Sequence, residues 1–177
     1  MRTRWGLLVI AVFLLGMFSG IALSKKSGAI DSNVYMGKTP EEAAAALMRE
    51  AVARAKDDSW ELLAVARAYY LGGDKEKGTA LINRVSAGGE SSDWAVIART
   101  YWEAGEKDKA MQAFEKSLRV NPDNAKVLAE FGAYLNVSGE RERAEKMFAK
   151  AFELGPKSTY LPAWAAGSYL GVVPRRR

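Results

Sequence analysis

The 177-residue sequence contains neither cysteine nor histidine. The chain therefore has no disulfides, no thiolate or imidazole metal ligands and no cysteine nucleophile, and it lacks the commonest general base near neutral pH. It also shows no cluster of metal-ligand carboxylates, no glycine-rich phosphate loop before a helix and no nucleophile elbow. These absences predict a protein that is not an enzyme and that needs no cofactor or metal.

The positive charge is concentrated at the two ends of the chain. The formal net charge is +5, yet Arg2, Arg4, Lys25, Lys26 and the arginines at 175–177 contribute seven positive charges. Removing those seven from +5 leaves −2 for the body between them. A slightly acidic body is a poor electrostatic match for a phosphate backbone, so no nucleic-acid partner is expected.

The sequence has one long uncharged run, at residues 5–23. A helix of about 19 residues rises roughly 28 Å, close to the hydrocarbon thickness of a bilayer. Arg2 and Arg4 precede the run, and a short basic N-terminus normally stays in the cytoplasm. We therefore expect a single-pass membrane anchor at residues 1–24, followed by a polar tether at 25–38. The rest of the chain would lie in the periplasm or an equivalent extracytoplasmic space.

The alternative reading of this segment is a cleaved signal peptide. Residues 2–4 would be its basic region, and Ala22 and Ser24 would supply the small residues of a cleavage site. That reading would release the same domain into the periplasm as a soluble protein. The anchor is favoured because the apolar run is long for a signal peptide and because Lys25 and Lys26 are poor residues just after a cut.

The body of the chain is repetitive. Residues 91–124 and 125–158 align without a gap at a separation of 34. A third, imperfect unit covers about 59–90 and has Gly78 where the others have alanine, so its second helix is expected to be weaker. The positions that match between the two full units are Trp94 with Leu128, Ile97 with Phe131, Ala98 with Gly132, Tyr101 with Leu135, Ala110 with Ala144, Phe114 with Phe148 and Pro122 with Pro156.

This pattern of large and small residues resembles the tetratricopeptide repeat (TPR), a helix–turn–helix unit of 34 residues. The resemblance implies an all-α fold, a right-handed α-solenoid of helix hairpins preceded by one N-terminal transmembrane or signal helix. We expect the TPR-like domain to occupy residues 39–171. Its expected parts are a leading helix at 40–56, the three repeats, a capping helix at 159–170 and, beyond the domain, a basic tail at 172–177.

In this family the first helix of each repeat lines a concave groove that binds partners. Arginine and large aromatics dominate binding hot spots, and in two successive repeats an aromatic follows an arginine by three residues. Such pairs suit a peptide that offers a carboxylate and an apolar side chain. The alternative is that the arginines pair with neighbouring glutamates and the aromatics fill the packing between repeats. The expected groove residues are Trp60, Arg67, Tyr70, Arg99, Trp102, Lys126, Asn136, Tyr160 and Trp164.

The function expected from these features is a membrane-anchored scaffold or adaptor. It would bind a protein or peptide in its groove and help to assemble or hold a membrane or envelope complex. One alternative is a constitutive accessory subunit of a larger membrane complex, whose anchor contacts other transmembrane helices through Gly16, Ser19 and Gly20. The other is the cleaved, soluble periplasmic protein.

Overall fold

The computed structural model describes residues 28–175. The expected anchor or signal peptide, and the first residues of the tether, lie outside the described residues. Within residues 28–175 there is no helix with the length and apolar character needed to cross a membrane. The chain divides into two units, Met1–Ala44 and Ala45–Arg177.

The described part of the first unit contains the short 3-10 helix η1 (Ser32–Val34) and the first turn of α2 (Pro40–Ala55). Thr39 and Glu42 form a reciprocal capping box at the start of α2. The Glu42 backbone N–H donates to Oγ1 of Thr39 at 3.3 Å, and the Thr39 N–H donates to Oε2 of Glu42 at 3.2 Å. These two bonds satisfy backbone donors that a helix leaves open at its N-terminus.

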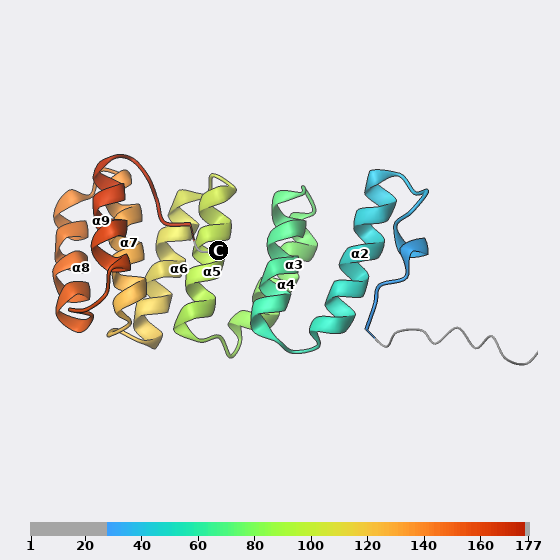
Figure 1. Cartoon of the computed structure of the whole chain (residues 1–177), viewed down its shortest axis with the longest axis horizontal. Helices are drawn as coiled ribbons and strands as arrows, with labels where there is room; N and C mark the ends of the chain where they lie inside the picture. The colour runs from blue at the N-terminus through green and yellow to red at the C-terminus, as the bar shows by residue number, and fades with distance from the viewer. Residues whose placement is uncertain (1–27, 176–177) are drawn as a thin grey trace, which may run out of the picture. The chain divides into compact units, whose positions relative to one another are not determined.

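The second unit is built from helix hairpins (Figure 1). The pairs α3/α4, α5/α6 and α7/α8 each pack closely, and α9 packs on α7 and α8. The described residues form eight α-helices and no strand, so the predicted all-α solenoid is confirmed. The bounds of the helices after α2 are α3 (Ser59–Leu71), α4 (Lys75–Ser86), α5 (Ser91–Glu103), α6 (Lys107–Val120), α7 (Ala125–Val137), α8 (Arg141–Leu154) and α9 (Tyr160–Tyr169).

Small residues allow the two helices of each hairpin to approach closely. Ala110 and Ala144 are completely buried where the second helix crosses the first. At the corresponding position in α4, a methyl group on Gly78 would lie 2.9 Å from Cβ of Tyr70 and 3.0 Å from the carbonyl oxygen of Ala66. The interpretation of Gly78 as only a weak point of the helix is therefore incomplete, because α4 lies too close to α3 to admit even an alanine.

The first helix of every hairpin ends in the same way, and so does α9. In each case a glycine adopts positive φ, and the next residue donates its N–H to a carbonyl five residues back, which closes the helix end. After the first three glycines an acidic residue precedes a new helix, whereas after Gly171 comes Val172, and the described residues 172–175 are not helical. Helix α9 therefore ends like the first helix of a repeat. The glycines are Gly73, Gly105, Gly139 and Gly171, with φ of 100°, 78°, 90° and 77°.

Candidate functional site

A hollow of about 970 Å³ lies over the first helices of the three hairpins. Neighbouring first helices contact one another, α3 with α5 and α5 with α7, so their side chains meet on one surface. Helix α3 contributes Trp60, Leu63, Ala64 and Arg67, helix α5 contributes Val96, Arg99, Trp102 and Glu103, and helix α7 contributes Tyr134. The C-terminal segment completes the lining with Val173, Pro174 and Arg175.

The first arginine of the hollow is held by an exposed ion pair between repeats. Nε of Arg67 donates to Oε2 of Glu103 at 2.7 Å, and both side chains are about half exposed. An ion pair that water reaches contributes little to stability, typically about 0–1 kcal/mol. Its structural effect is to neutralise the Arg67 charge at the rim of the hollow.

The second arginine is held by a buried ion pair. Nη1 of Arg99 lies 2.6 Å from Oε1 of Glu130, and the exposed fractions of the two side chains are 13% and 0%. Burial raises the pKa of the neighbouring Tyr134 phenol above its ordinary value, and the Glu130 charge raises it further. Tyr134 is therefore neutral at physiological pH, and the Arg99 charge is compensated by Glu130 beneath the hollow.

Three aromatic side chains, Trp60, Trp102 and Tyr134, contribute to the lining of the hollow. The Trp102 ring packs edge-on against the Tyr134 ring with centroids 4.8 Å apart, and the Lys107 ammonium lies 5.2 Å from the Trp102 ring. Trp102 is half-buried, whereas Trp60 is 51% exposed. Trp60 is thus the most accessible aromatic in the hollow, and Trp102 both lines the hollow and packs between repeats.

Tyr70 does not line the hollow, which corrects its expected position. Its side chain is only 3% exposed, and its hydroxyl donates to Oε2 of Glu106 at 2.7 Å. Lys109, Lys75 and this tyrosine hydroxyl hold the pKa of the Glu106 carboxyl down at about 2. Tyr70 therefore joins α3 to the turn before α6, and of the two aromatics that follow an arginine by three residues only Trp102 lines the hollow.

The remaining expected groove residues lie outside the hollow. Lys126 is exposed on α7, and Asn136 donates its amide to Oγ of Ser168 at 2.9 Å, which links α7 to α9. Tyr160 is 66% exposed, and its ring centroid lies 6.4 Å from that of Trp164. Four of the nine expected residues, Trp60, Arg67, Arg99 and Trp102, are brought together in the hollow.

The C-terminal segment returns from α9 to this surface. At Gly171 the N–H donates to the Ser168 carbonyl at 3.1 Å, and the Val172 N–H donates to the Gly167 carbonyl at 2.9 Å. The segment then runs back from α9 toward α5 (Figure 1). Val173 packs against the core and Pro174 is buried. The sequence predicted only a basic tail here, because no periodic pattern marks a segment this short.

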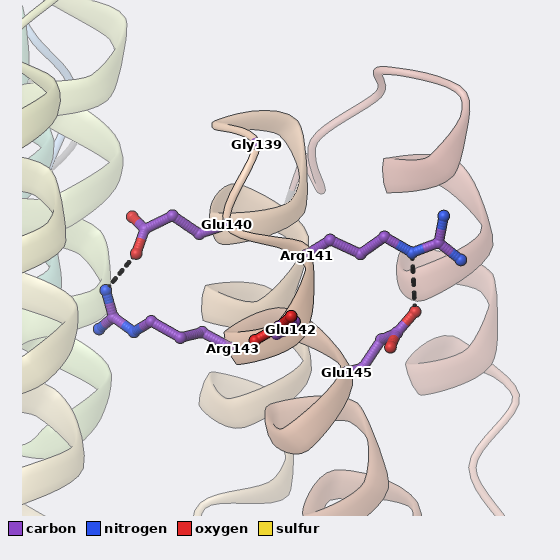
Figure 2. A pocket seen from close by; sticks show the side chains of 6 residues that line it. All are labelled: Gly139, Glu140, Arg141, Glu142, Arg143 and Glu145. Carbon is purple, nitrogen blue, oxygen red and sulfur yellow. Dashed lines mark hydrogen bonds and ion pairs between the residues drawn. The ribbon is translucent and has the colours of Figure 1, made fainter.

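A second recess, of about 710 Å³, lies at the turn between α7 and α8 (Figure 2). Its lining is charged, and the charges pair with one another. Arg143 contacts Glu140, and Nε of Arg141 donates to Oε1 of Glu145 at 2.8 Å. Four of the five charged side chains that line this recess pair with one another on an exposed turn, and the recess has no aromatic lining, so the hollow is the better candidate site.

Comparison with known proteins supports the repeat. Residues 94–124, which span most of the α5/α6 hairpin, match a family model described as tetratricopeptide repeat. A solved structure titled "Crystal structure of MamA" aligns with a TM-score of 0.51 at 16% identity, covering 74% of this chain and 77% of that chain. A second, "Crystal structure of MamA protein", aligns with a TM-score of 0.50 at 16% identity, covering 74% and 72%. At this identity the likeness shows the fold alone. No curated protein matches the sequence.

Proposed function

Because the chain is a tetratricopeptide-repeat protein, we propose that it is a binding scaffold that holds a segment of a partner protein in the hollow over α3, α5 and α7. The observation that carries the proposal is the lining of that hollow, where Trp60 and Trp102 lie beside Val96 and two arginines. Tryptophan and arginine are the side chains that contribute most to binding hot spots.

The size and the charge of the hollow narrow the kind of partner. A volume of about 970 Å³ is at the upper end of the range for small-molecule sites and accommodates a few residues of an extended peptide. Glu103 and Glu130 compensate Arg67 and Arg99 respectively. A carboxylate-bearing peptide, the ligand suggested by the sequence, would have to compete with these glutamates. An apolar segment that leaves both ion pairs in place fits the hollow better.

Position-specific photocrosslinking tests this proposal. A photoreactive amino acid at Trp60 should crosslink one partner in membranes from cells that produce the full chain. The matched control is the same amino acid at Ala149, which is exposed on α8 and lies outside the hollow. Crosslinking at Ala149 with none at Trp60 would place the partner on the other face and overturn the proposal.

We propose further that residues 5–23 hold this scaffold at a membrane, with the repeats on the extracytoplasmic side, where it helps to assemble or hold a membrane complex. The support is the uncharged run itself and the preceding Arg2 and Arg4. Protease added outside intact spheroplasts should digest the repeats. Protection of the repeats until the membrane is opened would refute the assigned side.

A further inference from the structure

One wall of the hollow is a piece of the same chain that returns from α9. Val173, Pro174 and Arg175 line the hollow together with residues of α3 and α5 that lie about 70 to 115 positions earlier in the sequence. Pro174 is buried, and Val173 is half-buried against the core. By contrast Leu170 and Val172, which connect this segment to α9, are 83% and 59% exposed. The contact with the hollow is therefore confined to a short stretch.

We propose that the surface of the first helices recognises an extended peptide in which an apolar residue, a proline and an arginine follow one another, and that Val173–Arg175, at one wall of the hollow, covers part of that surface as its internal occupant. An incoming partner segment of the same chemistry would have to displace these residues. This inference rests on the proposed function, because it names the class of peptide that the scaffold binds and adds a competitor for the same surface.

The local sequence explains why the segment is extended rather than helical. Proline fixes its own φ, and it disfavours the helical region for the residue before it, here Val173. A segment that is already extended loses little conformational freedom when it binds, which is why proline-containing peptides suit aromatic-lined grooves. In the hollow, Trp60 and Trp102 supply the aromatic lining beside Val173 and Pro174.

The charged side chains that line the hollow are compatible with the positive charge of Arg175. Arg67 and Arg99 are each paired with a glutamate of the next repeat, so they present no uncompensated pair of cations to Arg175. Arg175 acts electrostatically on Tyr134, where its positive charge opposes the rise in the phenol pKa. Glu103 also lines the hollow. Its carboxylate pairs with Arg67 where water reaches both side chains, whereas Glu130 pairs with Arg99 in the interior.

The position of Gly171 explains why the segment reaches the hollow. The bonds from Gly171 and Val172 back to Ser168 and Gly167 fix the direction in which the chain leaves α9. The described residues after Gly171, 172–175, are not helical, and they run back to the surface formed by the first helices. A segment tethered this closely has an effective concentration in the millimolar range, so a contact with a Kd well below that range would keep the surface largely covered.

Peptide binding to the full-length protein in detergent tests the inference. The probe is a fluorescent peptide that copies residues 171–177, and its affinity is measured by anisotropy against a scrambled peptide of the same composition. If the tail covers the hollow in roughly nine of ten molecules, removing it should tighten binding about tenfold. Val173→Asp and a chain that ends at Gly171 both remove the occupant. Leu170→Asp, a charge at an exposed site outside the hollow, is the matched control and should bind like the parent.

The position of the tail is measured separately. The sequence has no cysteine, so spin labels can be placed uniquely at Ala68→Cys, exposed on α3, and at Arg175→Cys. The interspin distance should lengthen when the probe peptide is added or Val173→Asp is introduced. Equal peptide affinity in the parent and in the chain that ends at Gly171, or an interspin distance that neither change alters, would overturn the role of the tail.

The remaining outcomes separate this inference from the proposed function. If no variant binds the probe peptide, or if the scrambled peptide binds equally well, the hollow does not recognise this chemistry and the inference is wrong. Crosslinking of a partner at Trp60 would still support the scaffold in that case. If the probe peptide binds in a tail-dependent way but no partner crosslinks at Trp60, the result supports the binding site and contradicts the proposed protein partner.

Discussion

Arg99→Ala should destabilise the protein far more than Arg67→Ala, although the two arginines hold the same repeat position. Arg99 pairs with Glu130, whose side chain is completely buried, so the substitution leaves that carboxylate in the interior without this cation. Breaking a buried pair in this way costs about 3–5 kcal/mol. Arg67 pairs with Glu103 where water reaches both side chains, and such a pair contributes about 0–1 kcal/mol.

Thermal unfolding followed by circular dichroism measures the difference. For a domain of this size, 1 kcal/mol corresponds to a shift in Tm of roughly 3–5 °C. Arg99→Ala should therefore lower the Tm by about 10–20 °C, and Arg67→Ala by no more than about 5 °C. Replacing the pair together, as Arg99→Leu with Glu130→Leu, should recover much of the loss because no buried charge remains.

Two results would refute this reasoning. Equal, small shifts in Tm for Arg99→Ala and Arg67→Ala would mean that the buried ion pair contributes no more to stability than the exposed one. A double leucine variant less stable than Arg99→Ala would mean that the pair itself, rather than the buried Glu130 carboxylate that has lost Arg99, sets the cost. If the prediction holds, an alanine at Arg99 cannot serve as a test of binding, because lost binding would follow from unfolding.

Three further predictions concern other parts of the solenoid. Gly78→Ala should lower the Tm even though alanine favours helix by about 1 kcal/mol, because the added methyl group would lie 2.9 Å from Cβ of Tyr70; an unchanged or raised Tm would contradict the close crossing. Ala110→Trp and Ala144→Trp should each cost at least about 1–3 kcal/mol by overpacking a completely buried site, and denaturant titration of both variants checks the repeat register. Glu106→Gln should lower the Tm at neutral pH. The pKa of the Glu106 carboxyl is depressed from 4.5 to about 2, so the contribution of its negative charge to stability is present above pH 4.5 and is lost as the pH falls toward 2. A Tm difference between variant and parent that stays constant across this window would contradict the prediction.

The repeat could be predicted from the sequence because its determinants are local and recur at a fixed spacing. Alanines at 110 and 144 and glycines at 105 and 139 mark a close crossing and a helix end in each unit. A pattern of this kind gives the order of the helices and the surface that the first helices share. It does not give the packing between repeats, which depends on how far each helix is rotated.

Tyr70 and Arg99 show where that limit lies. Family positions placed Tyr70 in the groove, but its hydroxyl reaches Glu106, 36 residues on, and the side chain is buried. Of the two interpretations of the arginines, pairing with glutamates describes their contacts, yet the spacing does not indicate that Glu130 is buried while Glu103 is exposed. The C-terminal segment could not be placed at all, since its contacts are with residues far away in the sequence.

The end of α9 also bears on how the molecule could be redesigned. Asp74, Glu106 and Glu140 each follow a turn glycine and precede a helix, whereas Val172 occupies that position after Gly171. A designer who replaced residues 172–177 with an acidic cap and a matching second helix would complete a further repeat. The same replacement would take Val173 and Pro174 out of the hollow. The length of the solenoid and access to its binding surface are thus not independent design variables, because residues 172–175 bear on both.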